Sequence, residues 1–225
     1  MNEIDIKVKE IKQSFRLMMD GATAQSMRQK GLNYHLNWGA TIPRLREMAD
    51  GILEEVRGGD EEMRGHIEPH PSPLNSLAIA LWKEDVRECK ILATMLMPPD
   101  EMLPEVTDIW MEQTPTLEIA EQAAFNLYQH LPYAADKAFE WIASEHDLPQ
   151  VCGYHVLCRL FMRGQEPSER GINEFLDQAM TALQSSNATL RKAAMQAVTR
   201  FAGLSIMHQR LARSVTRHSG IDIEL

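Results

Sequence analysis

Two glutamates in the stretch TLEIAEQ have the residue type and spacing that acid–base chemistry needs. Glu118 and Glu121 are three residues apart, so a helix through this stretch carries both carboxylates on one side. A positioned carboxylate can accept a proton or stabilise a cation that develops in a transition state. A pair at this spacing is also common on solvated helix surfaces. Both interpretations stay open.

Basic residues without acidic neighbours fill the last part of the chain. Between Gln178 and Ile221 there are six Lys or Arg residues and no Asp or Glu, although the whole chain has a net charge of −9. Such a stripe predicts contact with a polyanion such as nucleic acid. Cations near helix C-termini are also favoured by the helix dipole, and a basic end could dock on the acidic body of its own chain. The candidate nucleic-acid-binding residues are Arg191, Lys192, Arg200, Arg210, Arg213 and Arg217.

A Gly-bounded loop carries a small cluster of ring side chains, Tyr34, His35 and Trp38. Loop aromatics of this kind can form part of a binding cleft. They can equally pack as a local knot under the helix that follows. His155 lies in the middle of an apolar helical pattern, which is typical of a hydrogen-bonded core histidine.

The histidines and cysteines form no metal-binding pattern. His66 and His70 are four residues apart, but Pro69 and Pro71 break any helix that would align them, so we expect a solvated loop and neither metal nor cofactor. The cysteines lack a CxxC pair, which favours reduced core thiols. They are Cys89, Cys152 and Cys158.

The N-terminus, MNEIDIKVKEIK, mixes charged and apolar residues from its start. This composition fits neither a signal peptide nor a membrane segment. Together with the cysteine pattern, it leads us to expect a cytoplasmic protein with no membrane partner.

The elements that must position these residues are organised around Leu77 to Met97. This stretch reads as two short helices with a charged break between them, and Pro98 and Pro99 end the second helix. Helices this short are marginal alone and must bury their apolar faces against neighbours. The residue pattern predicts further helices near 5–19, 22–30, 41–56, 101–113, 117–130, 134–144, 148–162, 168–183, 188–202 and 206–217.

No segment alternates with period two for long enough to form a strand, so the predicted fold class is all-α. Short helices joined by brief turns, with pairs recurring every 30 to 40 residues, are typical of an α-α superhelix of the HEAT-like or armadillo type. We predict a single domain over residues 1–225. It would comprise capping helices at 1–30, repeats at 31–203, and a basic C-terminal helix and tail at 204–225.

Three stretches resemble the HEAT-repeat DNA alkylation-repair family, which is related to the AlkD glycosylase. GATIPRLREMADGI is similar to a family segment of the form GV-x-x-P-x-LR-x-x-A, and LAIALWKEDVRECKILATMLM is similar to its paired-helix signature. LRKAAMQAVTRFA is similar to its KA-x-x-W-x-LR helix. The matches run in the family order from Gly31 to Ala202.

The resemblance implies a concave basic surface for DNA and a carboxylate beside the sugar of a damaged nucleotide. A cationic alkylated base leaves readily, and a carboxylate stabilises the oxocarbenium-like sugar that remains. The family pairs a Trp with an Asp four residues later, where this chain has Leu117 and Glu121. Gln196 stands at a second Trp position of the family. The family also carries an Arg that faces the DNA backbone at the start of the helix aligned with 148–162, and in this chain no Arg precedes Arg159 in that helix.

These substitutions predict a nucleic-acid-associated family member whose base-excision chemistry is lost or altered. Its partner would be double-stranded DNA or another nucleic acid. The alternative is a protein-binding HEAT solenoid without a nucleic-acid role, which fits the net acidity. A third hypothesis is an active DNA glycosylase that uses Glu121.

Overall fold

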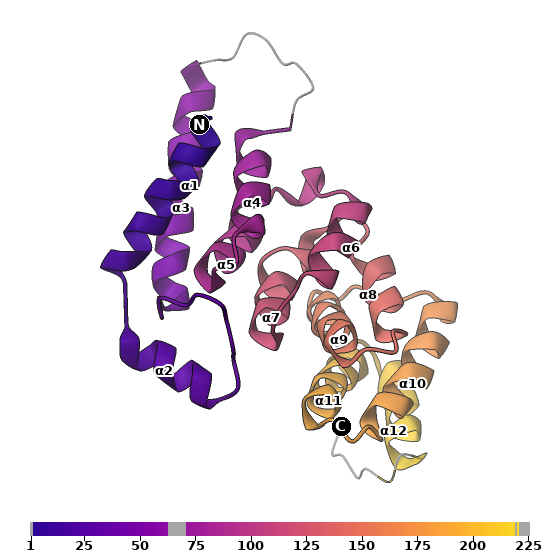
Figure 1. The fold of residues 1–225 in the computed structure, drawn as a ribbon. Coiled ribbons are helices and arrows are strands. Elements are labelled where there is room, and N and C mark those ends of the chain that lie inside the picture. The colour runs from indigo at the N-terminus through magenta and orange to yellow at the C-terminus, as the bar shows by residue number, and fades with distance from the viewer. Residues whose placement is uncertain (1, 63–70, 219, 221–225) are drawn as a thin grey trace. The chain divides into compact units, whose positions relative to one another are not determined.

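The computed structural model describes residues 2–62, 71–218 and 220, and over these ranges the chain is helical with no strand (Figure 1). His66 and His70 lie outside the described residues. The α helices are α1 (Glu3–Leu17), α2 (Gly21–Gln29), α3 (Ile42–Glu62), α4 (Pro73–Lys83), α5 (Arg87–Leu96), α6 (Pro104–Glu112), α7 (Leu117–Asn126), α8 (Ala134–Ile142), α9 (Asp147–Met162), α10 (Glu169–Leu183), α11 (Ala188–Ala202) and α12 (Ile206–His218). Two 3-10 turns, η1 (Pro99–Glu101) and η2 (Tyr128–His130), complete the elements.

The predicted helices are confirmed, but several of their ends differ: the helix expected over 41–56 extends to Glu62, and the first helix of the Leu77–Met97 pair begins at Pro73. The helix expected over 117–130 ends earlier, at Asn126, and the chain continues through a 3-10 turn. Side chains cap several helix starts: Ser72 accepts from the Asn75 backbone N–H, and Thr116 accepts from that of Ile119. Such caps satisfy backbone donors that have no partner within the helix. In the described part of the chain no helix is long and apolar enough to cross a membrane.

The chain forms two compact units, Met1–Leu127 and Tyr128–Leu225, here called unit 1 and unit 2. Each unit has its own apolar core. The prediction of one domain over the whole chain therefore stays a prediction.

In unit 1, α5 is the central helix, packed against α3, α4 and α7. The sequence predicts one buried face for this helix, but every α5 residue except Met95 is buried, including Arg87, Glu88 and Lys90. Neighbours on three sides leave it almost no solvated surface. Trp82 of α4 and Trp110 of α6 connect these two helices: their rings stack with centres 4.1 Å apart, and both side chains are buried.

In unit 2, α9 packs between α8 and α11, while α10 and α12 pack against α11. Gly153 allows the close approach of α8 and α9, because a Cβ there would lie 2.8 Å from the backbone oxygen of Ala138. Phe161, Phe175 and Phe201 meet edge-on or tilted at 5.0 to 5.6 Å between ring centres and form the aromatic core. This packing fixes α9 and α11 side by side.

Candidate nucleic-acid interface

A groove of about 370 Å³ runs along α9 and α11 of unit 2. Its walls are side chains at helical spacing on the solvent side of both helices. From α9 come His155, Cys158, Arg159 and Met162, and from α11 come Met195, Gln196, Thr199 and Arg200. The groove thus contains two guanidinium groups and no carboxylate. We call it the α9–α11 groove.

The positive charge of the groove acts on the pKa of the Cys158 thiol. Burial raises the pKa of Cys158, although the guanidinium groups of Arg200 and Arg159 act in the opposite direction by favouring the thiolate. Both guanidinium groups therefore lie near the Cys158 thiol. Cys158 and His155 are half-buried groove residues, so the predictions of a core thiol and a core histidine at these positions are wrong. The apolar pattern around them belongs to the opposite side of α9.

The basic residues predicted from the C-terminal run are separated by the fold. Arg200 lines the α9–α11 groove, beside Gln196. Lys192 is exposed one turn before Gln196 on the same helix. Arg191 instead donates hydrogen bonds to the backbone oxygens of Ser185 and Ser186 after α10.

The three arginines of α12 lie on its exposed side, opposite the buried His208, Ala212 and Thr216. They form the predicted basic stripe but do not line the groove. The stripe consists of Arg210, Arg213 and Arg217.

In unit 1, α7 presents Leu117, Glu121 and Phe125 at four-residue spacing. Leu117 is half-buried and Glu121 is exposed. Phe125, 38% exposed, is covered by the guanidinium of Arg46 from α3, 5.4 Å from the ring centre. An exposed aromatic ring held by a cation therefore stands one turn beyond the candidate carboxylate. Leu117 stands at the family's aromatic position, and the sequence interpretation did not consider Phe125, two turns further along the same face.

The two glutamates of the predicted acidic pair have different environments. The Glu118 carboxylate receives two hydrogen bonds from the Arg87 guanidinium, at 2.8 and 2.5 Å, and a third from the Tyr34 hydroxyl at 2.5 Å. Arg87 also binds the backbone oxygen of Ala40 at 2.9 Å and a carboxylate oxygen of Glu88 at 3.2 Å. Arg87 and Glu88 are 1% and 0% exposed. Glu118 is thus a structural anion, and only Glu121 faces solvent.

The Tyr34–Arg87–Glu88–Glu118 network shifts the pKa values of Glu118 and Tyr34 in opposite directions. Burial would raise the pKa of Glu118, but the hydrogen bonds from Arg87 and Tyr34 outweigh it and hold this pKa below the usual value. Burial and the bond to Glu118 both raise the pKa of the Tyr34 phenol. The network therefore keeps Glu118 ionised and Tyr34 neutral.

The aromatic loop divides between two roles. Tyr34 is fixed in the network and also bonds to Thr116 at 2.7 Å, whereas His35 is exposed. Trp38 is held by its backbone, whose N–H donates to Glu88, and its ring lines a groove beside α1. Tyr34 is therefore held by long-range partners at the start of α7 and not by a local knot under α3, whereas Trp38 lines a groove. The described residues contain no group of three or more His, Cys, Asp or Glu side chains that could hold a metal ion.

Arg87, Glu88 and Phe125 were missed by the sequence interpretation. In sequence, Arg87 and Glu88 belong to the charged break KEDVRE and look solvated. A usable signal was the largely apolar stretch CKILATMLM that follows them, whose single charge is Lys90, since a helix without a continuous polar face must be buried nearly all round.

The pairing of α4 with α5, α8 with α9 and α10 with α11 defines an all-helical repeat protein of the HEAT-like class. A solved structure with this fold superposes at a TM-score of 0.73 with 16% sequence identity, over 96% of this chain and 86% of that chain. That protein is described as belonging to a new family of proteins related to the HEAT-like repeat DNA glycosylases with affinity for branched DNA structures.

The family model described as DNA alkylation repair enzyme matches residues 11–203, and the chain belongs to this family. The match confirms the resemblance and extends it back into α1. No curated protein gives a significant match to the chain.

Proposed function

We propose that the chain binds nucleic acid through the α9–α11 groove of unit 2. The observation that carries this proposal is the pair Arg159 and Arg200, which face the same groove without an acidic residue in its lining. Guanidinium groups bind phosphate oxygens through paired, charge-assisted hydrogen bonds. Family membership and the branched-DNA affinity of the structural neighbour support the same partner class.

Base excision, by this proposal, is lost or altered. The carboxylate at Glu121 is exposed, and Leu117 replaces the aromatic residue at the family position beside it. A glutamate extends the carboxylate by one methylene relative to aspartate, and a displacement of about an ångström can cost roughly a hundredfold in a positioned reaction. Phe125 and Arg46 could contact a DNA backbone on this face without performing chemistry.

Binding to a blunt DNA duplex across a salt series tests the nucleic-acid role. Arg159→Ala/Arg200→Ala removes both cations of the groove lining, so the slope of log affinity against log salt should become shallower by about 1.8. Arg210→Ala/Arg217→Ala removes the same charge from the exposed side of α12 and is the matched control. Undetectable duplex binding at low salt, or equal losses in both double variants, contradicts the proposal.

Incubation with DNA that carries a methylated purine tests the chemistry. We expect no release of base above background. Release that disappears in Glu121→Gln would instead identify an active glycosylase and overturn the proposed loss of excision.

One observation favours the alternative of a protein-binding solenoid. Residues 1–127 hold 22 of the 32 acidic residues but only 13 of the 23 basic ones, so unit 1 alone carries −9. A surface of this sign repels nucleic acid and suits a basic protein partner. This function moves ahead if the duplex experiment shows no binding.

A further inference from the structure

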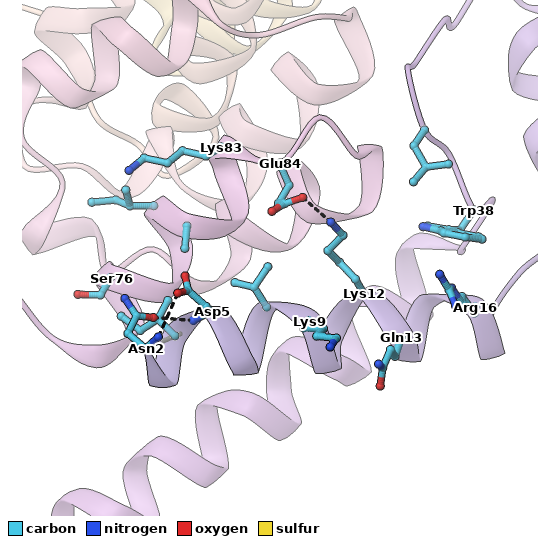
Figure 2. Close-up of a pocket in the computed structure, with 15 residues that line it drawn as sticks. Asn2, Asp5, Lys9, Lys12, Gln13, Arg16, Trp38, Ser76, Lys83 and Glu84 are labelled. Atoms are coloured by element: carbon cyan, nitrogen blue, oxygen red, sulfur yellow. Dashed lines mark hydrogen bonds and ion pairs between the residues drawn. The ribbon is translucent and has the colours of Figure 1, made fainter.

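A second groove, of about 870 Å³, lies within unit 1 between α1 and α4 (Figure 2). We call it the α1–α4 groove. Three of its cations come from α1 and one from α4, against two carboxylates. The cations are Lys9, Lys12, Arg16 and Lys83, and the carboxylates are Asp5 and Glu84. The lining is therefore net positive on a unit that is otherwise acidic.

The α1 cations form one row along the groove. Lys9, Lys12 and Arg16 are separated by three and four residues, which places them on the same side of the helix. With a rise of 1.5 Å per residue, the row extends over about 10 Å. A row of this kind follows a linear anion better than a compact one.

The two carboxylates of the lining are already engaged. Glu84 is paired with Lys12 at 2.5 Å, and Asp5 closes the capping box at the start of α1 by accepting from the Asn2 backbone N–H (Figure 2). Lys9, Arg16 and Lys83 are exposed. These three cations are thus presented to a ligand in the groove.

An aromatic wall stands at one end of the row. Arg16 lies over the ring of Trp38, 5.8 Å from guanidinium carbon to ring centre, and Figure 2 shows the two side chains next to each other. The Trp38 backbone is fixed on both sides, since its N–H donates to Glu88 and its carbonyl accepts from the Asp20 N–H. The backbone from which the ring projects is therefore fixed independently of any ligand.

We infer that the α1–α4 groove binds a single nucleic-acid strand, with Lys9, Arg16 and Lys83 on its phosphates and Trp38 beside a base or sugar. Single-strand sites typically combine a positive groove along the backbone with an aromatic stacking surface. The acidic surroundings disfavour a duplex, whose second strand would face them. The inference takes its partner class from the proposed function, but its residues are separate, so each can fail alone.

The test uses the full-length protein with a blunt duplex and with the same duplex extended by an oligo-dT tail. We expect wild type to bind the tailed DNA more tightly. Lys9→Gln/Lys83→Gln should lose this gain and keep its affinity for the blunt duplex. Its salt slope for the tailed DNA should be shallower by about 1.4, because a single-strand phosphate contact contributes about 0.7. Arg28→Gln/Lys30→Gln removes two exposed charges elsewhere in unit 1 and should retain the gain.

Three outcomes would overturn the inference. Wild type could bind tailed and blunt DNA equally, or the α1–α4 variant could match its Arg28/Lys30 control. Poly-glutamate could also compete for the groove as well as oligo-dT does at equal charge, which would assign the site to an acidic protein segment. Oligo-dT binding that depends on Lys9 and Lys83 without any blunt-duplex binding would support this inference and contradict the duplex proposal.

Discussion

Arg87 joins three parts of unit 1 through its guanidinium. It binds Glu118 at the start of α7, the Ala40 carbonyl in the loop before α3, and Glu88 on its own helix. Glu88 in turn accepts from the backbone N–H groups of Trp38 and Ala40. Because the loop carries the groove residue Trp38, this buried network positions a candidate binding side chain as well as stabilising the core.

Replacing Arg87 by Met should destabilise unit 1 by about 3 to 5 kcal/mol, because Glu88 and Glu118 would keep buried carboxylates without their cation. Chemical denaturation gives the free energy of unfolding. Lys7→Met is the control: it breaks an ion pair to Glu55 on the surface and should cost at most about 1 kcal/mol. Similar losses in the two variants would contradict a structural role for the network.

Glu118 should make stability depend on acid pH. Its pKa is lower in the folded than in the unfolded chain, so its contribution is complete above the unfolded value near 4.5 and is lost as the pH falls through the folded value. The free energy of unfolding should therefore fall below about pH 4.5 more steeply in wild type than in Glu118→Gln. Parallel pH profiles for the two proteins would refute this assignment.

At the scale of elements, the α8–α9 contact sets the position of the α9–α11 groove. Gly153 leaves no room for a side chain: a Cβ would lie 2.8 Å from both the Ala138 oxygen and the Ile142 side chain. The close packing of α8 on α9 leaves the groove side of α9, which carries Arg159, facing solvent.

Gly153→Ala should destabilise the protein by about 1 to 3 kcal/mol, because α8 and α9 must separate to admit the methyl group. Gly51→Ala is a matched control within α3, where a Cβ meets no atom within 4 Å. That change should stabilise by about 0.5 to 1 kcal/mol through helix propensity. Thermal unfolding should show a lower midpoint temperature for Gly153→Ala and a higher one for Gly51→Ala. An unchanged midpoint for Gly153→Ala would show that α8 and α9 can move apart without loss of stability.

At the scale of the whole molecule, charge is unevenly distributed along the chain. Unit 1 carries the net charge of −9, and the charges of unit 2 balance. The proposed duplex binding by the α9–α11 groove would have to rely on a few local contacts, because unit 2 offers no general positive field.

This distribution predicts a modest salt dependence for duplex binding. If Arg159, Lys192 and Arg200 each neutralise one phosphate, the slope of log affinity against log salt should be about −2.7. Fluorescence anisotropy from low to moderate salt measures it. A much steeper slope would mean that the α12 stripe also contacts the duplex.

The sequence by itself determined the helices and which of their faces are buried. The Leu77–Met97 pair, the core positions of Trp82 and Trp110 and the family membership all follow from local periodicity and motif, because helix formation and burial of an apolar stripe depend on neighbours three and four residues away.

Only the tertiary structure decided which polar residues act together. Glu118 and Glu121 look alike in sequence, yet one is bound by Arg87, from another helix, and the other faces solvent. Likewise, Arg200 joins Arg159 while the α12 arginines lie elsewhere, and Lys9 meets Lys83 across the α1–α4 groove. These partners are far apart in the chain, and their meeting depends on how whole helices pack, which local spacing does not encode.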